Sequence, residues 1–289
     1  MNSRKKNVLL AAQRLFIEKG FSSTSVQDII EEAKISKGTF YNYFSSKNEC
    51  IVAILENVKE ETSIKRRELL VQQNDADLNI LVEQMTIRMN IYQDQNLYPI
   101  IVSIIHSQDL ELRDLVKMNY LEEVNWLAKR LVDIFGEQTK DIAVDCSVLV
   151  LGMIQQLQHP WIRQYTKVST EKIIRFVMRR IETIIYEMAR TNDSLLKRPC
   201  FELNTEEKLL TKDEISKQLE SFYLKEINSL KLKEIQMIEY ILEELNREQP
   251  RKFLLEKIVP SLTEAFTNTS LEHKSTMIIY HIWKFLDRI

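Results

Sequence analysis

The sequence predicts an all-α protein, on three observations. Glycine and proline are scarce, with four and five among 289 residues. Apolar residues recur at the helical spacing i, i+3, i+4 and i+7 along most of the chain, and no stretch alternates as a half-buried strand does. The composition, 44% apolar and 28% charged, is that of an ordinary globular protein. We therefore expect helices throughout.

Four helices are expected in the first 70 residues. The apolar face of the first begins near Val8 and ends before Gly20. A second short helix follows the polar turn at residues 22–25, and a third begins after Ser36. The fourth runs from Lys47 to about Leu70. The second and third are short and closely spaced, which is the arrangement of a helix-turn-helix at about residues 25–44.

The third helix has an outward face suited to DNA. On a helical wheel its aromatic residues Phe40, Tyr43 and Phe44 form one buried arc, whereas Gly38 and Asn42 point away. That polar face fits a recognition helix, with Thr39 and Asn42 for bases. Lys37, Tyr41, Lys47 and Thr24 are the candidates for phosphates. The full set of expected DNA-binding residues is Thr24, Ser25, Ser36, Lys37, Gly38, Thr39, Tyr41, Asn42, Tyr43 and Lys47. Residues 1–50 hold eight Lys/Arg and five Asp/Glu, so this end of the chain is basic.

At these residues the sequence resembles the TetR family of bacterial transcriptional repressors, over about residues 4–50 and not in the C-terminal part. The matching run comprises Gly20-Phe21, Thr24 to Ile29, Ala33 to Tyr41, Tyr43-Phe44 and Ser46-Lys47. The resemblance implies a ligand-responsive repressor that binds an inverted-repeat operator as a homodimer and is released by a small molecule. One departure is Lys34, where the family usually has glycine. A lysine in a left-handed turn there would be strained by about 1 kcal/mol, so we expect the turn to be slightly reshaped.

Three domains are expected. Residues 1–47 form the DNA-binding domain, residues 48–195 a ligand-binding and dimerisation domain, and residues 200–289 a helical extension. In the middle domain helices are expected at about 78–92, 98–107, 109–135, 139–158 and 169–191. A linker near residues 198–207 precedes four amphipathic segments. These segments form either a small helical bundle packed on the regulatory domain or a second sensor or protein-docking module.

The resemblance also implies a pocket and a dimer interface in the middle domain. Soft and aromatic side chains suit an apolar or cationic-aromatic inducer, although core packing explains them equally well. The pocket candidates are Met85, Met89, Tyr92, Met118, Trp126 and Met153. A long apolar stripe suits the dimer interface, with internal core as the alternative. Its members are Ile174, Val177, Met178, Ile181, Ile185 and Met188.

The sequence offers little catalytic chemistry. Cys50, Cys146 and Cys200 are far apart, the four histidines are scattered, and no glycine-rich phosphate loop, GxSxG or HExxH occurs. We expect no enzyme, no metal and no cofactor. The longest apolar stretch, residues 148–154, is far short of the ~20 residues of a membrane span, and no signal peptide is recognisable, so a cytoplasmic protein is expected. The alternative function is a chromosome-organising or structural DNA-binding protein of the same fold without an inducer.

Overall fold

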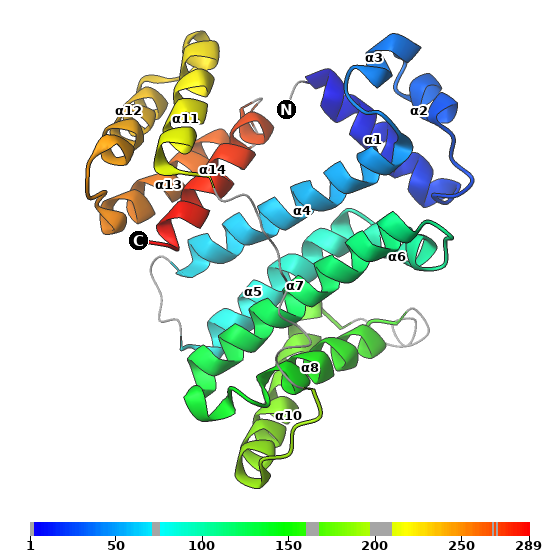
Figure 1. Cartoon of the computed structure of the whole chain (residues 1–289), viewed down its shortest axis with the longest axis vertical. Helices are drawn as coiled ribbons and strands as arrows, with labels where there is room; N and C mark the ends of the chain where they lie inside the picture. The colour runs from blue at the N-terminus through cyan, green and yellow to red at the C-terminus, as the bar shows by residue number, and fades with distance from the viewer. Residues whose placement is uncertain (1–2, 71–75, 160–167, 197–209, 268, 270) are drawn as a thin grey trace. The chain divides into compact units, whose positions relative to one another are not determined.

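The computed structural model describes residues 3–70, 76–159, 168–196, 210–267, 269 and 271–289 (Figure 1). Every regular element among them is a helix, which confirms the expected all-α class. None of the described helices is long and apolar enough to cross a membrane. The expected linker near residues 198–207, and Cys200 within it, lie outside the described residues.

The chain divides into two compact units. Unit 2 comprises residues 9–54 and 72–204, and unit 1 comprises residues 1–8, 55–71 and 205–289. Helix α4 (Lys47–Leu70) is one continuous helix that belongs to both units. Its residues up to Ile54 are part of unit 2, and those from Leu55 on are part of unit 1. The units therefore group residues differently from the three expected domains, whose boundaries stay a prediction.

The N-terminal head is built from three short helices around an aromatic core. They are α1 (Ser3–Glu18), α2 (Val26–Glu32) and α3 (Lys37–Tyr41). Phe16 and Phe21 stack with ring centroids 5.2 Å apart, and Phe40 and Phe44 are almost completely buried. Gly20, with a φ of 81°, ends the first helix, as expected. These contacts hold α2 and α3 in a fixed relation.

The other helices of unit 2 pack around one apolar core. Its helices are α5 (Leu78–Asp94), α6 (Leu97–Ile105), α7 (Leu110–Phe135), α8 (Ala143–Leu157) and α10 (Thr170–Thr191). Helix α8 packs against α7 and α10, and α10 also packs against α5. The expected helix at 139–158 starts later, at Ala143, because Gly136 (φ 92°) ends α7 and a 3-10 turn, Glu137–Thr139, intervenes.

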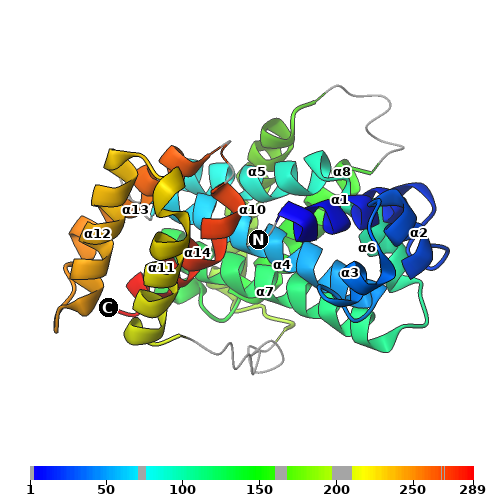
Figure 2. The same ribbon diagram turned by 90° about the horizontal axis from the view of Figure 1, so that it is seen from above.

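The C-terminal part of unit 1 is a four-helix bundle. Its helices are α11 (Lys212–Glu226), α12 (Leu232–Asn246), α13 (Lys252–Phe266) and α14 (Glu272–Leu286), which correspond to the four expected segments. Helices α11 and α13 each contact both α12 and α14 (Figure 1 and Figure 2). Ile64 of α4 belongs to the same apolar core as Leu219, Ile238 and Trp283. The bundle is therefore built onto the C-terminal half of α4.

A buried carboxylate joins α12 to α13. The side chain of Glu244 is completely buried and accepts hydrogen bonds from Nε of Arg251 at 3.1 Å. Arg247 pairs with the same carboxylate at 3.0 Å. The hydrogen bond from Arg251 is the main cause that lowers the pKa of Glu244 to about 2, so the carboxylate is ionised and paired at neutral pH. This pairing fixes the turn between the two helices.

Candidate nucleic-acid interface

The turn between α2 and α3 has the geometry expected of a helix-turn-helix. Ser25 caps α2 in a reciprocal capping box with Asp28. Helix α2 has Ala33 as its C-cap, and Lys34 follows with a φ of 53°, so the backbone is left-handed at this lysine. Ser36 then caps α3, because its Oγ accepts from the amide of Thr39 at 3.1 Å.

Helix α3 separates a buried aromatic side from an exposed polar side. Phe40 is completely buried, whereas Lys37, Gly38 and Asn42 are exposed and Tyr41 is 49% exposed. The helix is shorter than expected, since Tyr41 is its last residue and Asn42 is its C-cap. The amide of Asn42 is thus at the end of the helix, on the side that faces solvent.

Two hydroxyl groups and one glycine shape the first turn of α3. Ser36 Oγ and Thr39 Oγ1 are 2.8 Å apart and share a hydrogen bond. A Cβ added at Gly38 would meet only Ser36 Oγ, at 3.9 Å, so the space above Gly38 is open. Nothing inside the head requires a glycine there, and the open space allows another backbone to approach closely.

Lys47 and Thr24 are placed differently from the other expected DNA-binding residues. Nζ of Lys47 donates to the carbonyl oxygens of Phe21 at 2.9 Å and Thr24 at 2.8 Å, and it lies 4.5 Å from the centroid of the Phe21 ring. Burial lowers the pKa of Lys47, which Asp109 partly opposes. The Thr24 hydroxyl is buried and donates to the carbonyl of Gly20 at 2.8 Å. Both side chains are therefore engaged inside the head.

The outer surface of α2 is held by an ion pair with α1. Lys19 Nζ lies 2.8 Å from Asp28 Oδ1. Hydrogen bonds from Lys19 and from Ser25 hold the pKa of Asp28 well below its usual range. Arg14 of α1 also pairs with Glu32 of α2. These pairs engage Asp28 and Glu32, whereas Glu31 accepts a hydrogen bond from Gln27 at 2.8 Å.

Two hydrogen bonds join the head to the middle of unit 2. Asn48 Nδ2 donates to Asp109 Oδ2 at 2.6 Å, and Gln13 Nε2 donates to the carbonyl oxygen of Gln95 at 2.7 Å. Asp109 is the N-cap of α7 and Gln95 is the C-cap of α5. The C-cap of α5 and the N-cap of α7 are therefore bonded directly to α1 and to the start of α4.

The expected dimer stripe on α10 requires a correction. Ile174, Val177, Met178, Ile181 and Ile185 are all at most 1% exposed and belong to the core that α10 forms with α5 and α8. Met188 is partly buried against the same core. Because these side chains are covered by their own chain, they are not available to a second copy.

The expected pocket residues lie in or near the same core. Met85 and Met89 are core members, Tyr92 is 5% exposed, and Trp126 and Met153 pack against the core from outside. Met118, on α7, is half-buried. Their role in binding a ligand stays a prediction.

A buried ion pair beside these residues was not foreseen. Nε of Arg88 on α5 lies 3.2 Å from Glu123 Oε2 on α7, and Nη2 of Arg88 donates to the Tyr92 hydroxyl at 3.0 Å. Tyr98 packs on Tyr92 at 5.8 Å, and its hydroxyl lies 3.2 Å from the Met89 sulfur. Burial acts to lower the pKa of Arg88, and the charge of Glu123 together with Tyr92 and Tyr98 outweighs it, so the pKa is raised. Arg88 and Glu123 are 35 residues apart in sequence, and each resembles an ordinary surface residue of its own helix.

The described residues contain no group of three His, Cys, Asp or Glu side chains arranged to hold a metal ion. The capped second helix, the tight turn and the exposed polar side of α3 together define a helix-turn-helix DNA-binding protein. Residues 8–54 match the model of the family described as bacterial regulatory proteins, tetR family. This match covers nearly the same residues as the resemblance to the TetR family that the sequence showed, and it supports a helix-turn-helix transcriptional regulator.

Known proteins resemble the chain over different lengths. The HTH-type transcriptional regulator YuxN of Bacillus subtilis strain 168 is 24% identical over 294 residues, which is 92% of this chain and 94% of YuxN. The HTH-type transcriptional repressor KstR2 of Mycobacterium tuberculosis is 25% identical over 138 residues, 47% of this chain and 67% of KstR2. A solved transcriptional regulator (TerR/AcrR family) from Aquifex aeolicus VF5 has a TM-score of 0.49 and 23% identity, covering 63% of this chain and 99% of that one. The similarity to YuxN extends over most of both chains, so it includes the C-terminal extension that the resemblance at residues 4–50 left out.

Proposed function

We propose that the protein is a homodimeric repressor that binds an inverted-repeat operator and leaves it when a small molecule binds. The exposed polar side of α3 is the observation that carries this proposal. The name of KstR2, a transcriptional repressor, supports the sign of regulation. In this reading one head occupies each half-site, with α3 in the major groove and α2 across the backbone.

The residues of α3 divide between bases and phosphates. The amide of Asn42 can pair with an adenine edge, and Thr39 can contact a base while Ser36 holds its hydroxyl. Lys37 and Tyr41 are exposed donors beside this face and suit phosphates. Gly38 leaves room for the DNA to approach. The side chains of Thr24 and Lys47 are not among the proposed DNA contacts, because their donors already bond to carbonyl oxygens of the head.

The proposed dimer interface is the outward side of α8 and α10. Leu149 on α8 and Phe176 on α10 are each 43% exposed, and Tyr186 on α10 is 61% exposed. A Cβ added at Gly152 of α8 would meet no atom within 4 Å, so the fold of one protomer does not need glycine there. A second α8 could approach closely at this point.

The proposed inducer site surrounds the buried Arg88–Glu123 pair. Met89, Tyr92 and Tyr98 provide soft and aromatic contacts around it. An apolar or cationic-aromatic molecule would fit these contacts, and a cation would compete with Arg88 for the carboxylate of Glu123. Movement of α5 or α7 would then reach the head through Gln95 and Asp109, and only a ligand that prefers the moved state lowers operator affinity.

Selection of binding sites from a random DNA library tests the function. The expected product is an inverted repeat whose half-site centres are about 10–10.5 base pairs apart, or a multiple of that spacing. Fractionated metabolite extracts should then release the protein from the selected DNA. Uniform binding without sequence preference, with no release by any fraction, would favour the chromosome-organising alternative.

The dimer is tested by sedimentation of two matched variants. Phe176→Glu should give monomers, because a charge without a partner is costly inside an interface. Phe253→Glu changes the same type of residue on α13, which is 66% exposed, and should leave the dimer intact. Dimers in both variants would place the interface elsewhere.

A further inference from the structure

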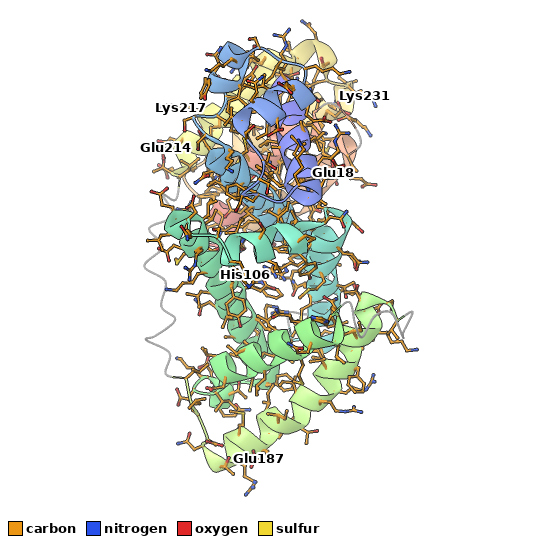
Figure 3. The ribbon with its side chains drawn as sticks, turned by 90° about the vertical axis from the view of Figure 1, so that its right-hand side faces the viewer. Glu18, His106, Glu187, Glu214, Lys217 and Lys231 are labelled. Atoms are coloured by element: carbon orange, nitrogen blue, oxygen red, sulfur yellow. The ribbon has the colours of Figure 1, made fainter. Side chains whose placement is uncertain are left out.

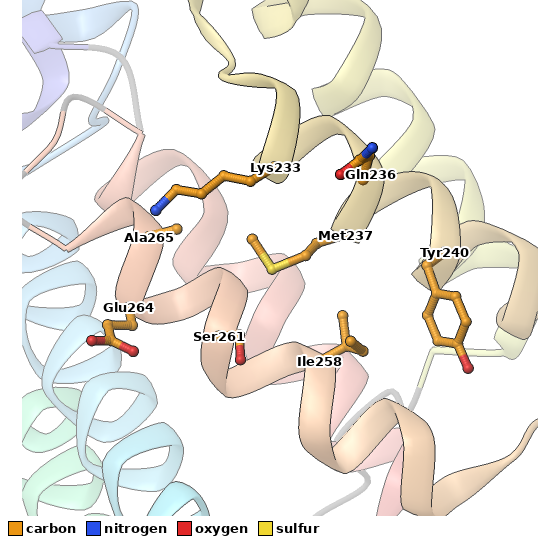
Figure 4. A pocket seen from close by; sticks show the side chains of 8 residues that line it. All are labelled: Lys233, Gln236, Met237, Tyr240, Ile258, Ser261, Glu264 and Ala265. Atoms are coloured by element: carbon orange, nitrogen blue, oxygen red, sulfur yellow. The ribbon is translucent and has the colours of Figure 1, made fainter.

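The C-terminal bundle contains a groove of about 650 Å³ between α12 and α13 (Figure 4). Met237 of α12 and Ile258 of α13 form its apolar middle. Lys233 and Glu264 lie toward one end, and Tyr240 lies toward the other. The volume is within the range of ligand sites, and the lining combines an apolar floor with a few polar groups.

Each of the two charges at one end of the groove has the sign that is unfavourable at its own helix terminus. Lys233 is in the first turn of α12, where the helix end is already positive, and Glu264 is in the last turn of α13, where it is already negative. The ion pairs described in this unit use other side chains, so neither charge is neutralised among the described residues. A ligand with an anion beside a cation would satisfy both helix ends together.

Helix α13 faces the groove on one side and α4 on another. Glu256 of α13 pairs with Nη2 of Arg67 on α4 at 3.2 Å, and Arg67 also pairs with Asp287 of α14 at 2.9 Å. Glu68 of α4 is half-buried in the same region, and its Oε1 is buried with no hydrogen-bond partner among the described residues. Burial raises the pKa of Glu68, and the negative charge of Glu264 adds to the rise. The helix that lines the groove is therefore joined to α4 by the Glu256–Arg67 pair.

We propose that this groove is a second effector site, which binds a zwitterionic amphiphile and acts on the DNA-binding head through α4. The anion of the ligand lies at Lys233, its ammonium group at Glu264, and its apolar body over Met237 and Ile258. Because α13 lines the groove and also pairs with α4 through Glu256 and Arg67, a shift of α13 on binding changes its packing on α4. The effect on DNA rests on the function proposed above, whereas binding in the groove does not.

Equilibrium dialysis of the full chain tests the site without DNA. The probes are L-tryptophan, a free amino acid, and dodecylphosphocholine below its micelle concentration, a lipid-like source of the same paired charges. At least one should bind once per chain. N-acetyl-L-tryptophan and L-tryptophan amide, which each lack one charge, should bind at least about tenfold more weakly than L-tryptophan if the free amino acid is the ligand.

Variants place the binding in the groove. Lys233→Ala and Glu264→Gln should each weaken binding of the preferred probe about tenfold or more. Lys217→Ala, an exposed lysine on α11 (Figure 3), should bind as the wild type does. The site is refuted if neither zwitterion binds, or if the two groove variants bind like Lys217→Ala.

The coupling is tested on the DNA sequence that the protein selects. A saturating probe should change the affinity of the wild type for this DNA at least about fivefold and leave the affinity of Lys233→Ala unchanged. An unchanged wild-type affinity would overturn the coupling through α4. A protein that binds the probe in the groove but selects no DNA sequence would refute the proposed function and the coupling with it, and the groove site would stand.

Discussion

The side chains of Asn48 and Asp109 connect the first turn of α4 to the first turn of α7. Asn48 Nδ2 donates to Asp109 Oδ2 at 2.6 Å, while Asp109 Oδ1 accepts from the amide of Leu112 at 3.0 Å. One carboxylate therefore caps α7 and holds the helix that follows the DNA-binding head. Any shift of the start of α7 is transmitted to α4 at this point.

This link should appear as a non-additive pair in unfolding experiments. Asn48→Ala removes the link alone and should cost about 0.5–1.5 kcal/mol, and Asp109→Ala should cost about 1 kcal/mol more because the α7 cap is also lost. In urea unfolding the double variant should be less destabilised than the sum by about the energy of the link. Asn48→Ala combined with Asp77→Ala, which removes the N-cap of α5, serves as the additive control. Additivity in both pairs would show that the link carries no energy.

Replacing Lys37 should change the salt dependence of DNA binding, whereas replacing Lys47 should change the stability of the head. Lys37→Ala removes an exposed cation and should lower the salt dependence of DNA binding by about one charge. Lys47→Ala removes the donor for the carbonyls of Phe21 and Thr24. It should destabilise the head by about 1–3 kcal/mol and leave the salt dependence unchanged. The measurements are thermal unfolding and DNA affinity between 50 and ~200 mM salt. A reduced salt dependence in Lys47→Ala would show instead that Lys47 contacts a phosphate.

Lys34 should be replaceable by glycine with a gain in stability. Its φ of 53° is unfavourable for a residue with a side chain, and glycine adopts it without that cost. Lys34→Gly should raise the free energy of unfolding by about 0.5–1 kcal/mol. Lys34→Ala keeps the unfavourable backbone and should stay within about 0.5 kcal/mol of the wild type. Equal stability of the two variants would mean that the turn holds no strain.

Glu60 of α4 should make the protein less stable as the pH rises. Burial raises the pKa of this carboxyl from 4.5 to about 7, and the charge of Glu56 adds to the rise while Lys59 opposes it. Between pH 4.5 and 7 the folded protein binds this proton more tightly than the unfolded chain does. The stability that it contributes is therefore full at low pH and is lost as the pH rises through this window.

Substitution of Glu60 isolates this effect. Glu60→Gln should raise the free energy of unfolding at pH 8 by about 1–2 kcal/mol relative to the wild type and flatten its fall between pH 5 and ~8. Glu61→Gln serves as the control, because Glu61 is half-buried and pairs with Lys65 at 2.6 Å. Denaturant unfolding across this pH range provides the comparison, and parallel curves for wild type and Glu60→Gln would exclude Glu60 as the source.

The sequence predicted individual helices better than it predicted what covers them. Helix α4 has the expected bounds, Lys47 and Leu70, because its periodicity and cap are local features. The stripe through Ile181 was visible too, but a wheel does not show whether the covering helices belong to the same chain or to a second copy. The structure assigns it to α5 and α8 of the same chain.

The candidate site shows the same limit. The short turn between α2 and α3 and the exposed side of α3 follow from local pattern and were predicted. The carbonyl oxygens that hold Lys47 lie 23 to 26 residues away, and the partner of Arg88 lies on another helix. Contacts between residues distant in sequence decide whether a charged side chain faces a ligand or the protein, and one sequence does not show them.

Sequence-resolved DNA binding by Asn42→Ala tests the central claim, that the exposed side of α3 reads the operator. For each single-base change in the selected site, the affinity of wild type and variant is measured at one salt concentration. The variant should lose about 1–3 kcal/mol of discrimination at one position of each half-site and keep the preferences elsewhere. Asn246→Ala, at the exposed C-terminal end of α12, is the matched control and should read every position as the wild type does. An Asn42→Ala protein with the complete wild-type preference would contradict the assignment of α3 as the recognition helix.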